Sequence, residues 1–275
     1  MTLTSGAHIW ANGIRQHYLH FAGVGSRVLI VPGIVSPAIL WRHVGEWLCR
    51  THNCFVLDVR GRGLSESGAH LDYGFDACAD DLVEFVRALK LSPLAIVGHS
   101  MGARIAVRAA CRSPELFESL ILLDPPTSGP GRRPYPISKS RTLKLLRSAR
   151  RAEDLPAVQT SGAKPWPDDL LRLRSEWLPT CDERAVHVAY DEFHSQDLFS
   201  DLARTSMPVS LLAAGLGDVV SDADIADMRR VRTDLRAARL AGVGHQMQAE
   251  DFAAFSDALG AMLRNQKLDT DRFAS

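Results

Sequence analysis

The segment Gly98-His99-Ser100-Met101-Gly102 constrains the fold of this chain more than any other. It follows the apolar run 94–97 and opens the alanine-rich helical pattern 101–112. A strand-to-helix turn this tight strains the backbone of its central residue, and side chains two residues before or after it would collide with their surroundings. The segment therefore predicts that the Ser100 hydroxyl projects from the carboxyl end of a strand as a nucleophile.

Short apolar runs alternate with helical patterns along most of the chain. Such runs, buried on both faces, are typical of a mostly parallel sheet covered by helices on both sides. Near the N-terminus, Asn12-Gly13 lies between two short runs and predicts a hairpin turn, because this pair readily adopts positive φ angles. Strands are expected at 27–31, 54–57, 94–97, 120–123, 209–213 and 236–240, and helices at 39–48, 75–89, 101–112 and 252–263.

This alternation stops between Pro125 and Ser206, where many prolines separate short helical patterns and no strand is evident. An insertion of this size between two strands predicts a helical cap over one edge of the sheet. We therefore expect a core domain formed by residues 1–124 and 207–275, and a cap formed by residues 125–206.

Composition excludes several classes of partner. The chain has 275 residues, and its 32 Lys and Arg balance 32 Asp and Glu, so no basic excess is available to neutralise a nucleic-acid backbone. The apolar stretches are shorter than the roughly 20 residues of a membrane helix, and residues 1–10 do not resemble a signal peptide. Five cysteines without a C-x-x-C pair argue against a disulfide framework or structural zinc. We expect a cytoplasmic protein that binds neither nucleic acid nor membrane.

A serine hydroxyl needs a general base to become an effective nucleophile. His245 directly follows the last expected strand, as the chain order serine, acid, histidine requires. Two aspartates are candidates for the acid that orients it. Asp218 follows the next-to-last strand, which is the usual position, and Asp124 ends the strand after Ser100. Both loops are expected at the same end of the sheet, so the sequence leaves both aspartates as candidates.

Two backbone N–H groups are candidates for an oxyanion hole. The N–H of Met101 opens the helix after the serine and would face an incoming oxyanion. The second donor is expected from the turn after Val31, where Gly33 lets the backbone approach closely and Ile34 supplies the N–H. Acyl transfer by such a site requires no metal or organic cofactor.

With these motifs in place, the chain resembles the α/β-hydrolase superfamily over nearly its whole length. The motifs are Asn12-Gly13, Pro32-Gly33, Asp58-Val-Arg-Gly-Arg-Gly-Leu-Ser65, the segment around Ser100, Gly215-x-x-Asp218 and Gly244-His245. The resemblance implies an eight-stranded, mostly parallel sheet with helices on both faces and a helical cap insertion.

A closer resemblance is to the N-formylmaleamate deformylases of bacterial nicotinate degradation, carried by residues 32–37, 57–65 and 124–136. Members of that family cleave a formamide from a small dicarboxylic monoamide. In that family the acid is assigned to the aspartate after the strand that follows the serine, which maps onto Asp124. The resemblance implies a Ser-His-Asp amidohydrolase that converts N-formylmaleamate to maleamate and formate.

The same triad also serves carboxylesterases, lactonases and carbon–carbon hydrolases, and the scaffold occurs in non-catalytic binding proteins. These readings stay open as alternatives, with the binding protein the least favoured. A serine-directed covalent probe separates an enzyme from a binding protein, and p-nitrophenyl esters compared with small carboxylated amides separate an esterase from a deformylase.

A carboxylated substrate needs cationic groups near the serine. Residues 131–151 contain eight Lys and Arg and no acid. Arg132 and Arg133 follow Asp124 closely enough to reach the cleft, and the planar guanidinium group binds a carboxylate through two hydrogen bonds. We expect these two arginines to bind the substrate and the rest of the run to form a solvated helix face.

Overall fold

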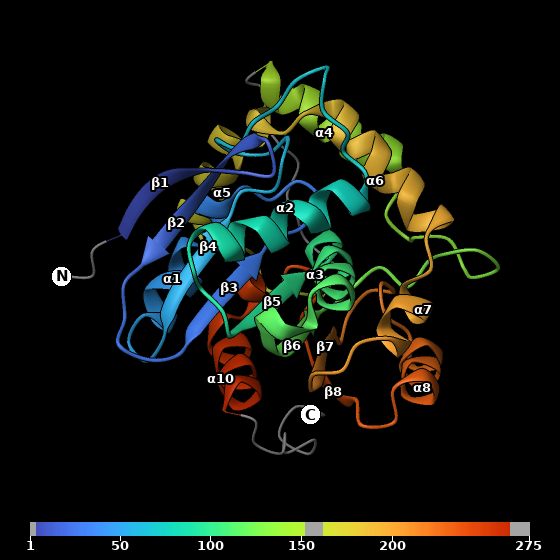
Figure 1. Cartoon of the computed structure of the whole chain (residues 1–275). Coiled ribbons are helices and arrows are strands. Elements are labelled where there is room, and N and C mark those ends of the chain that lie inside the picture. Colours follow the sequence, from blue (N-terminus) through green and yellow to red (C-terminus); the bar gives the residue numbers. More distant parts are fainter. Residues whose placement is uncertain (1–3, 152–161, 265–275) are drawn as a thin grey trace.

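The computed structural model describes residues 4–151 and 162–264 (Figure 1). Its centre is an eight-stranded sheet in the order β1-β2-β4-β3-β5-β6-β7-β8. β2 pairs antiparallel with both β1 and β4, and all other neighbours are parallel. The predicted mostly parallel sheet is confirmed. The strands are β1 (Thr4–Ala11), β2 (Ile14–Phe21), β3 (Arg27–Val31), β4 (Asn53–Leu57), β5 (Leu94–His99), β6 (Phe117–Leu123), β7 (Val209–Ala214) and β8 (Arg236–Leu240).

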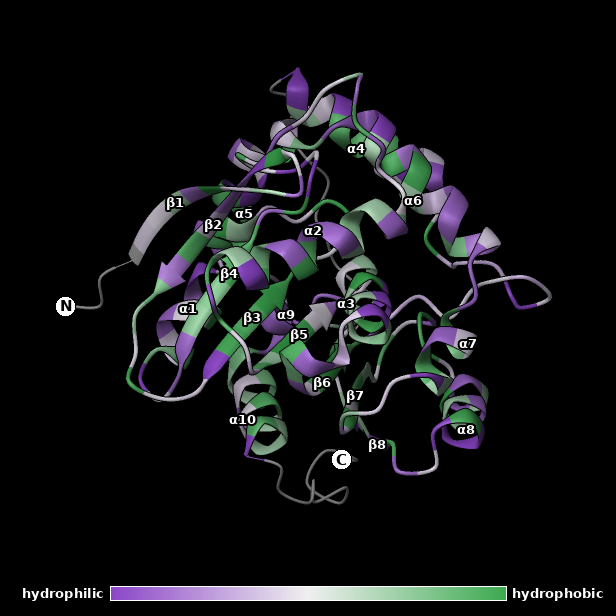
Figure 2. Cartoon of the chain, viewed as in Figure 1, coloured by the Kyte–Doolittle hydropathy of each residue, from purple (hydrophilic) through white to green (hydrophobic). Residues whose placement is uncertain are grey.

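The strands follow from the sequence in two ways. β5 and β7 consist of small or apolar residues, apart from His99 at the end of β5, and are buried along their whole length, as strands covered on both faces must be. They lie in the largely hydrophobic centre of the molecule in Figure 2. At the sheet edge, Asn12 (φ 52°) and Gly13 (φ 71°) form the predicted turn between β1 and β2.

Helices cover both faces of the sheet. On one face, residues of η1, α1 and α10 pack together with strand residues such as Ile30 and Val97. On the other face, residues of α2, α3 and α8 pack against Leu29 and Ile96. The sheet therefore separates two apolar layers. These helices are η1 (Ala38–Trp41), α1 (Arg42–Leu48), α2 (Phe75–Ala88), α3 (Met101–Arg112), η2 (Pro114–Leu116), α8 (Asp222–Val231), α9 (Met247–Glu250) and α10 (Phe252–Leu263).

Residues 125–206 contain no strand within their described part and lie over the carboxyl ends of the sheet strands (Figure 1). Side chains such as Leu146 and Phe193 join the same apolar layer as α2 and α3, so the segment packs closely on the sheet. Its helices are α4 (Lys139–Arg150), α5 (Asp168–Trp177), η3 (Leu178–Thr180), α6 (Glu183–Ser195) and α7 (Leu198–Ala203).

Helix α3 lies very close to β3, and a glycine makes this possible. A Cβ built on Gly102 would collide with the backbone carbonyl oxygens of Val31 and Pro32. These atoms belong to a buried strand end and cannot move independently. The close approach fixes the start of α3 beside the turn that follows β3.

We predict that Gly102→Ala destabilises the fold by about 3 kcal/mol, because the added methyl group overpacks a rigid backbone contact. Gly260→Ala is the matched control. It also adds a methyl group inside a helix, but there the group would meet only side chains, those of Arg264 and Trp47. Urea unfolding should show a large loss for the first variant and a change within ~1 kcal/mol for the second. Equal stability of Gly102→Ala and the wild type would contradict this packing argument.

Candidate active site

Ser100 lies at the sharp turn between β5 and α3, with φ 53° and ψ −120°. Its N–H donates to the carbonyl of Leu123 at 2.9 Å, which holds this strained backbone against the neighbouring strand. A Cβ on Gly98 would lie 2.5 Å from the Cα of Ala103, so the flanking glycine is sterically required, as the sequence predicts. The turn therefore presents the serine hydroxyl at the carboxyl end of β5.

The Ser100 hydroxyl meets the predicted base. Oγ lies 3.0 Å from Nε2 of His245, and Nδ1 of the same ring lies 2.7 Å from Oδ2 of Asp124. Asp124 is itself held tightly, because its N–H donates to Leu212 at 2.9 Å and its Oδ1 accepts from the N–H of Ala214 at 3.1 Å. Serine, imidazole and carboxylate thus form one continuous hydrogen-bonded relay.

The second candidate acid does not join this relay. Asp218 is exposed, and its backbone carbonyl accepts from Arg133. Arg239 holds the same loop from β8 by donating to the carbonyls of Ala214 and Val220. The same loop also contacts the segment before His245, because the N–H of Leu216 donates to the carbonyl of Val243 at 2.7 Å. Of the two aspartates that the sequence left open, Asp124 alone contacts the imidazole.

The turn after β3 lies against the nucleophile. A Cβ on Gly33 would be 3.4 Å from Cβ of Ser100 and 3.0 Å from the ring of His99, so only glycine fits without displacing them. The following carbonyl, of Ile34, accepts from Nε of Arg62 at 3.1 Å. Within the described residues, the N–H groups of Ile34 and Met101 form no hydrogen bond. The N–H groups of Ile34 and Met101 therefore stay the predicted oxyanion donors.

Two buried residues position the loop that carries the base, and sequence reasoning assigned neither of them. His99 Nε2 lies 2.9 Å from the carbonyl of His245. Burial, reinforced by the charge of His245, lowers the pKa of His99 to about 3, so its ring is neutral near pH 7. Glu250 accepts from the backbone N–H groups of Gly244 and Gln246, which flank the base. Glu250 lies five residues after His245, but no motif indicated its role.

Tyr135 is a further residue that the sequence did not single out. Its side chain is buried against the rings of Tyr190 and Phe193 and interacts with the Ser100 side chain. Burial raises the pKa of this phenol, so it is protonated at neutral pH. Segment 125–206 thereby contributes a hydroxyl group that interacts with the nucleophile.

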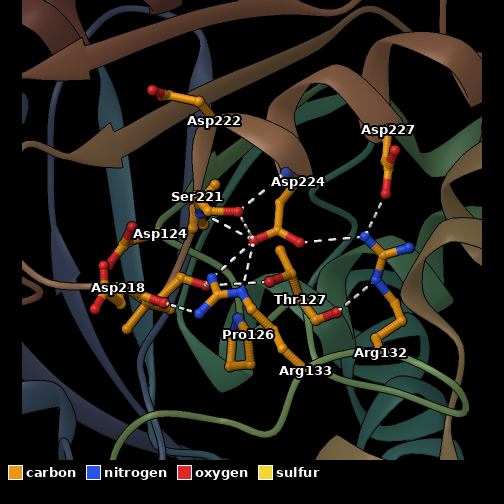
Figure 3. Close-up of polar contacts among 12 residues, drawn as sticks. Asp124, Pro126, Thr127, Arg132, Arg133, Asp218, Ser221, Asp222, Asp224 and Asp227 are labelled. Carbon is orange, nitrogen blue, oxygen red and sulfur yellow. Dashed lines mark hydrogen bonds and ion pairs between the residues drawn. The ribbon is translucent and has the colours of Figure 1, made fainter.

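The expected substrate ligands Arg132 and Arg133 are engaged elsewhere (Figure 3). Arg132 Nη2 lies 2.7 Å from Asp227, and Arg133 Nη2 lies 2.7 Å from Asp224. Burial acts to raise the pKa of Asp224, but hydrogen bonds from Ser221 and from both arginines lower it. In this structure both guanidinium groups are therefore engaged by acids of helix α8, and their role in substrate binding stays a prediction. Their guanidinium groups join the start of segment 125–206 to helix α8.

The site has the geometry of a nucleophile that is activated by a base. His245 can accept the Ser100 proton, Asp124 holds the ring, and two N–H groups can stabilise an oxyanion. Within residues 4–151 and 162–264, no group of His, Cys, Asp or Glu could hold a metal ion, and no helix is long and apolar enough to cross a membrane. The arrangement supports acyl transfer through a covalent serine intermediate.

Comparison with known proteins gives consistent matches. A model of the α/β hydrolase fold matches residues 26–174. N-formylmaleamate deformylase of Pseudomonas putida is 44% identical over 265 residues, which cover 94% of this chain and 97% of that protein. 2-(Acetamidomethylene)succinate hydrolase of Mesorhizobium japonicum is 27% identical over 81% of this chain and 82% of its own. A crystal structure of a serine-to-alanine variant of N-formylmaleamic acid deformylase from Pseudomonas putida superimposes with a TM-score of 0.86 at 42% identity, covering 93% of this chain and 100% of that one.

We predict that Asp124→Asn lowers kcat by about 10⁴-fold, because the amide cannot stabilise the protonated imidazole or hold its reactive tautomer. Asp218→Asn is the matched control and should keep kcat near the wild-type value, because its side chain is exposed and, among the described residues, only its backbone carbonyl accepts a hydrogen bond. Circular dichroism should show both variants folded. A larger loss for Asp218→Asn than for Asp124→Asn would contradict the assignment.

The low pKa of His99 generates a prediction about acid stability. Between about pH 6.5 and pH 3, the unfolded chain binds a proton at this position that the folded chain does not, so acidification destabilises the fold. His99→Gln keeps a donor for the His245 carbonyl but removes the titration. Urea unfolding at several pH values should therefore show that the free energy of unfolding of His99→Gln falls less between about pH 6 and pH 4 than that of the wild type. The difference between the two slopes should be at most ~1.4 kcal/mol per pH unit. Identical slopes would contradict it.

Proposed function

This chain belongs to the α/β-hydrolase fold family, and we propose that it hydrolyses the formamide bond of N-formylmaleamate to give maleamate and formate. The observation that carries the proposal is 44% identity to N-formylmaleamate deformylase across 94% of the chain. The hydrogen-bonded series Ser100, His245 and Asp124 supplies the chemistry that such a reaction needs.

In the first half-reaction, His245 accepts the Ser100 proton as Oγ attacks the formyl carbonyl. Asp124 stabilises the imidazolium that forms. The carbonyl oxygen becomes an oxyanion, which accepts hydrogen bonds from the N–H groups of Met101 and Ile34, each contributing about 3 kcal/mol to the transition state. Because both donors are backbone groups fixed by tight turns, they need not reorganise during the reaction.

Collapse of the tetrahedral intermediate breaks the bond between the formyl carbon and the amide nitrogen. His245 returns its proton to that nitrogen, and maleamate leaves. The formyl group stays on Ser100 as an ester. A water molecule that gives a proton to His245 then attacks this ester, and its collapse releases formate and regenerates the serine hydroxyl. The cycle consumes one water molecule and no cofactor.

Segment 125–206 is proposed to act as a cap over this chemistry, on a core formed by residues 1–124 and 207–275. The buried Tyr135 beside Ser100 supports this division, because it extends the site into the segment. We place the protein in the cytoplasm, without a nucleic-acid partner, acting on a small carboxylated molecule. Its five cysteines are free thiols, as that compartment favours.

The test is formate release from N-formylmaleamate, measured beside hydrolysis of p-nitrophenyl acetate. We predict that the formamide is the preferred substrate by kcat/KM and that Ser100→Ala lowers kcat by about 10⁶-fold. A fluorophosphonate probe should label the wild type and not the variant. Rapid ester hydrolysis without formate release would replace the deformylase assignment with an esterase, and an active Ser100→Ala variant would overturn the mechanism.

A further inference from the structure

Arg174 on α5 is a buried cation with no counterion in residues 4–151 and 162–264. The residue is only 6% exposed. Within the described residues, its guanidinium group forms neither a hydrogen bond nor an ion pair. Other buried arginines are satisfied: Arg60 pairs with Asp81, and Arg62 donates to backbone carbonyls. Burying an unpaired charge costs free energy of folding, so the burial of Arg174 needs an explanation.

The ring beside Arg174 carries a second unsatisfied donor. The guanidinium carbon lies 5.7 Å from the ring centroid of Trp166. The indole Nε1 of Trp166 is buried and has no acceptor among the described residues. Indole and guanidinium groups are donors only, so neither can satisfy the other. The two side chains together form a buried group of donors that is suited to an anion.

The electrostatic surroundings reinforce this reading. Burial, and then the positive charge of Arg141, lower the pKa of Arg174 to about 10, and no acidic group among the described residues offsets them. The guanidinium is therefore still charged at neutral pH. Among the described residues, the charge nearest in effect to Arg174 is therefore another cation, the exposed Arg141.

The location of the pair connects it to the active site. Trp166 and Leu170 pack against Ala249 of α9, a helix that begins two residues after His245. Helix α5 also contacts η1, which follows the turn that carries Ile34. Arg174 lies one turn after Leu170 and so shares its inward face. The unsatisfied donors thus belong to the layer between α5 and the two turns that bear the base and the oxyanion donor.

We propose that Arg174 and the indole N–H of Trp166 form the subsite that binds the carboxylate of the substrate. The ligand is a short-chain carboxylate whose scissile carbonyl is a few bonds from the charge. Arg174 donates two hydrogen bonds to the carboxylate and Trp166 one. The proposed subsite rests on the proposed function for the identity of the natural substrate. The comparison of two esters does not depend on that function.

The test uses two esters of similar size, mono-p-nitrophenyl succinate and the neutral p-nitrophenyl butyrate. Wild-type kcat/KM should favour the carboxylated ester, and Arg174→Met should reduce this preference by roughly 10²-fold, mostly through KM. Trp166→Phe, which keeps the ring and removes the donor, should reduce it less. The matched control is Arg172→Met, because Arg172 is exposed on the same helix and lies 4.0 Å from Glu176; its preference should equal that of the wild type.

Thermal unfolding separates a ligand-binding role from a structural one. Removing an unpaired buried cation should leave the melting temperature of the free protein unchanged or raise it. Maleamate should stabilise the wild type and fail to stabilise Arg174→Met. The proposal is overturned if Arg174→Met slows both esters equally, if maleamate stabilises the variant as it does the wild type, or if the wild type neither prefers the carboxylated ester nor binds maleamate.

Formate release distinguishes this proposal from the proposed function. If the wild type prefers the carboxylated ester and Arg174→Met removes that preference, but no formate is released from N-formylmaleamate, the subsite stands and the deformylase assignment fails. If formate is released and Arg174→Met leaves KM for N-formylmaleamate unchanged, the function stands and the subsite fails.

Discussion

Two strained backbone positions at the carboxyl edge of the sheet hold the rest of the site together. Ser100 (φ 53°) and Asp124 (φ 44°) both adopt left-handed conformations directly after neighbouring parallel strands. Each is fixed by its N–H, which donates to the carbonyl of Leu123 and of Leu212, respectively. The sheet therefore holds both residues in their strained backbone conformations, and the two side chains project toward the same imidazole. Because folding of the sheet offsets the free energy of these strained conformations, the backbone need not rearrange when the substrate binds.

The formal net charge of zero hides a strongly uneven distribution. The basic run at the start of segment 125–206 is largely neutralised by acids from other elements, as Arg132 and Arg133 are by Asp224 and Asp227. Arg174 is different, because it is buried and no acid in the described part of the chain pairs with it. The charges that indicate a binding site in this protein are those without an ion-pair partner among the described residues. The formal net charge of the sequence does not reveal them.

The sequence was sufficient where local physics dictates structure. The tight turn at Ser100 requires glycines, and the last strand leads directly to His245, so both positions could be identified from spacing alone.

The choice between Asp124 and Asp218 could not be made from the residues, because both follow strands that end at the same edge. What separates them is that Asp124 lies 2.7 Å from Nδ1 of His245, whereas Asp218 is exposed in a loop held by Arg133 and Arg239 through contacts distant in the sequence. The ion pairs of Arg132 and Arg133 were not foreseen for the same reason, since their partners lie about 90 residues away. Tyr135, Glu250 and Arg174 carry no motif, and burial alone distinguishes them.

The central claim is that Ser100 attacks the formyl carbonyl of the substrate and carries the formyl group as an ester. The most direct measurement is mass spectrometry of the peptide containing Ser100 after rapid acid quench of a reaction with N-formylmaleamate. The account predicts a peptide heavier by one formyl group in place of the serine hydrogen, absent when the substrate is omitted. A maleamyl-type acyl group on Ser100, with formamide as the first product, would contradict it.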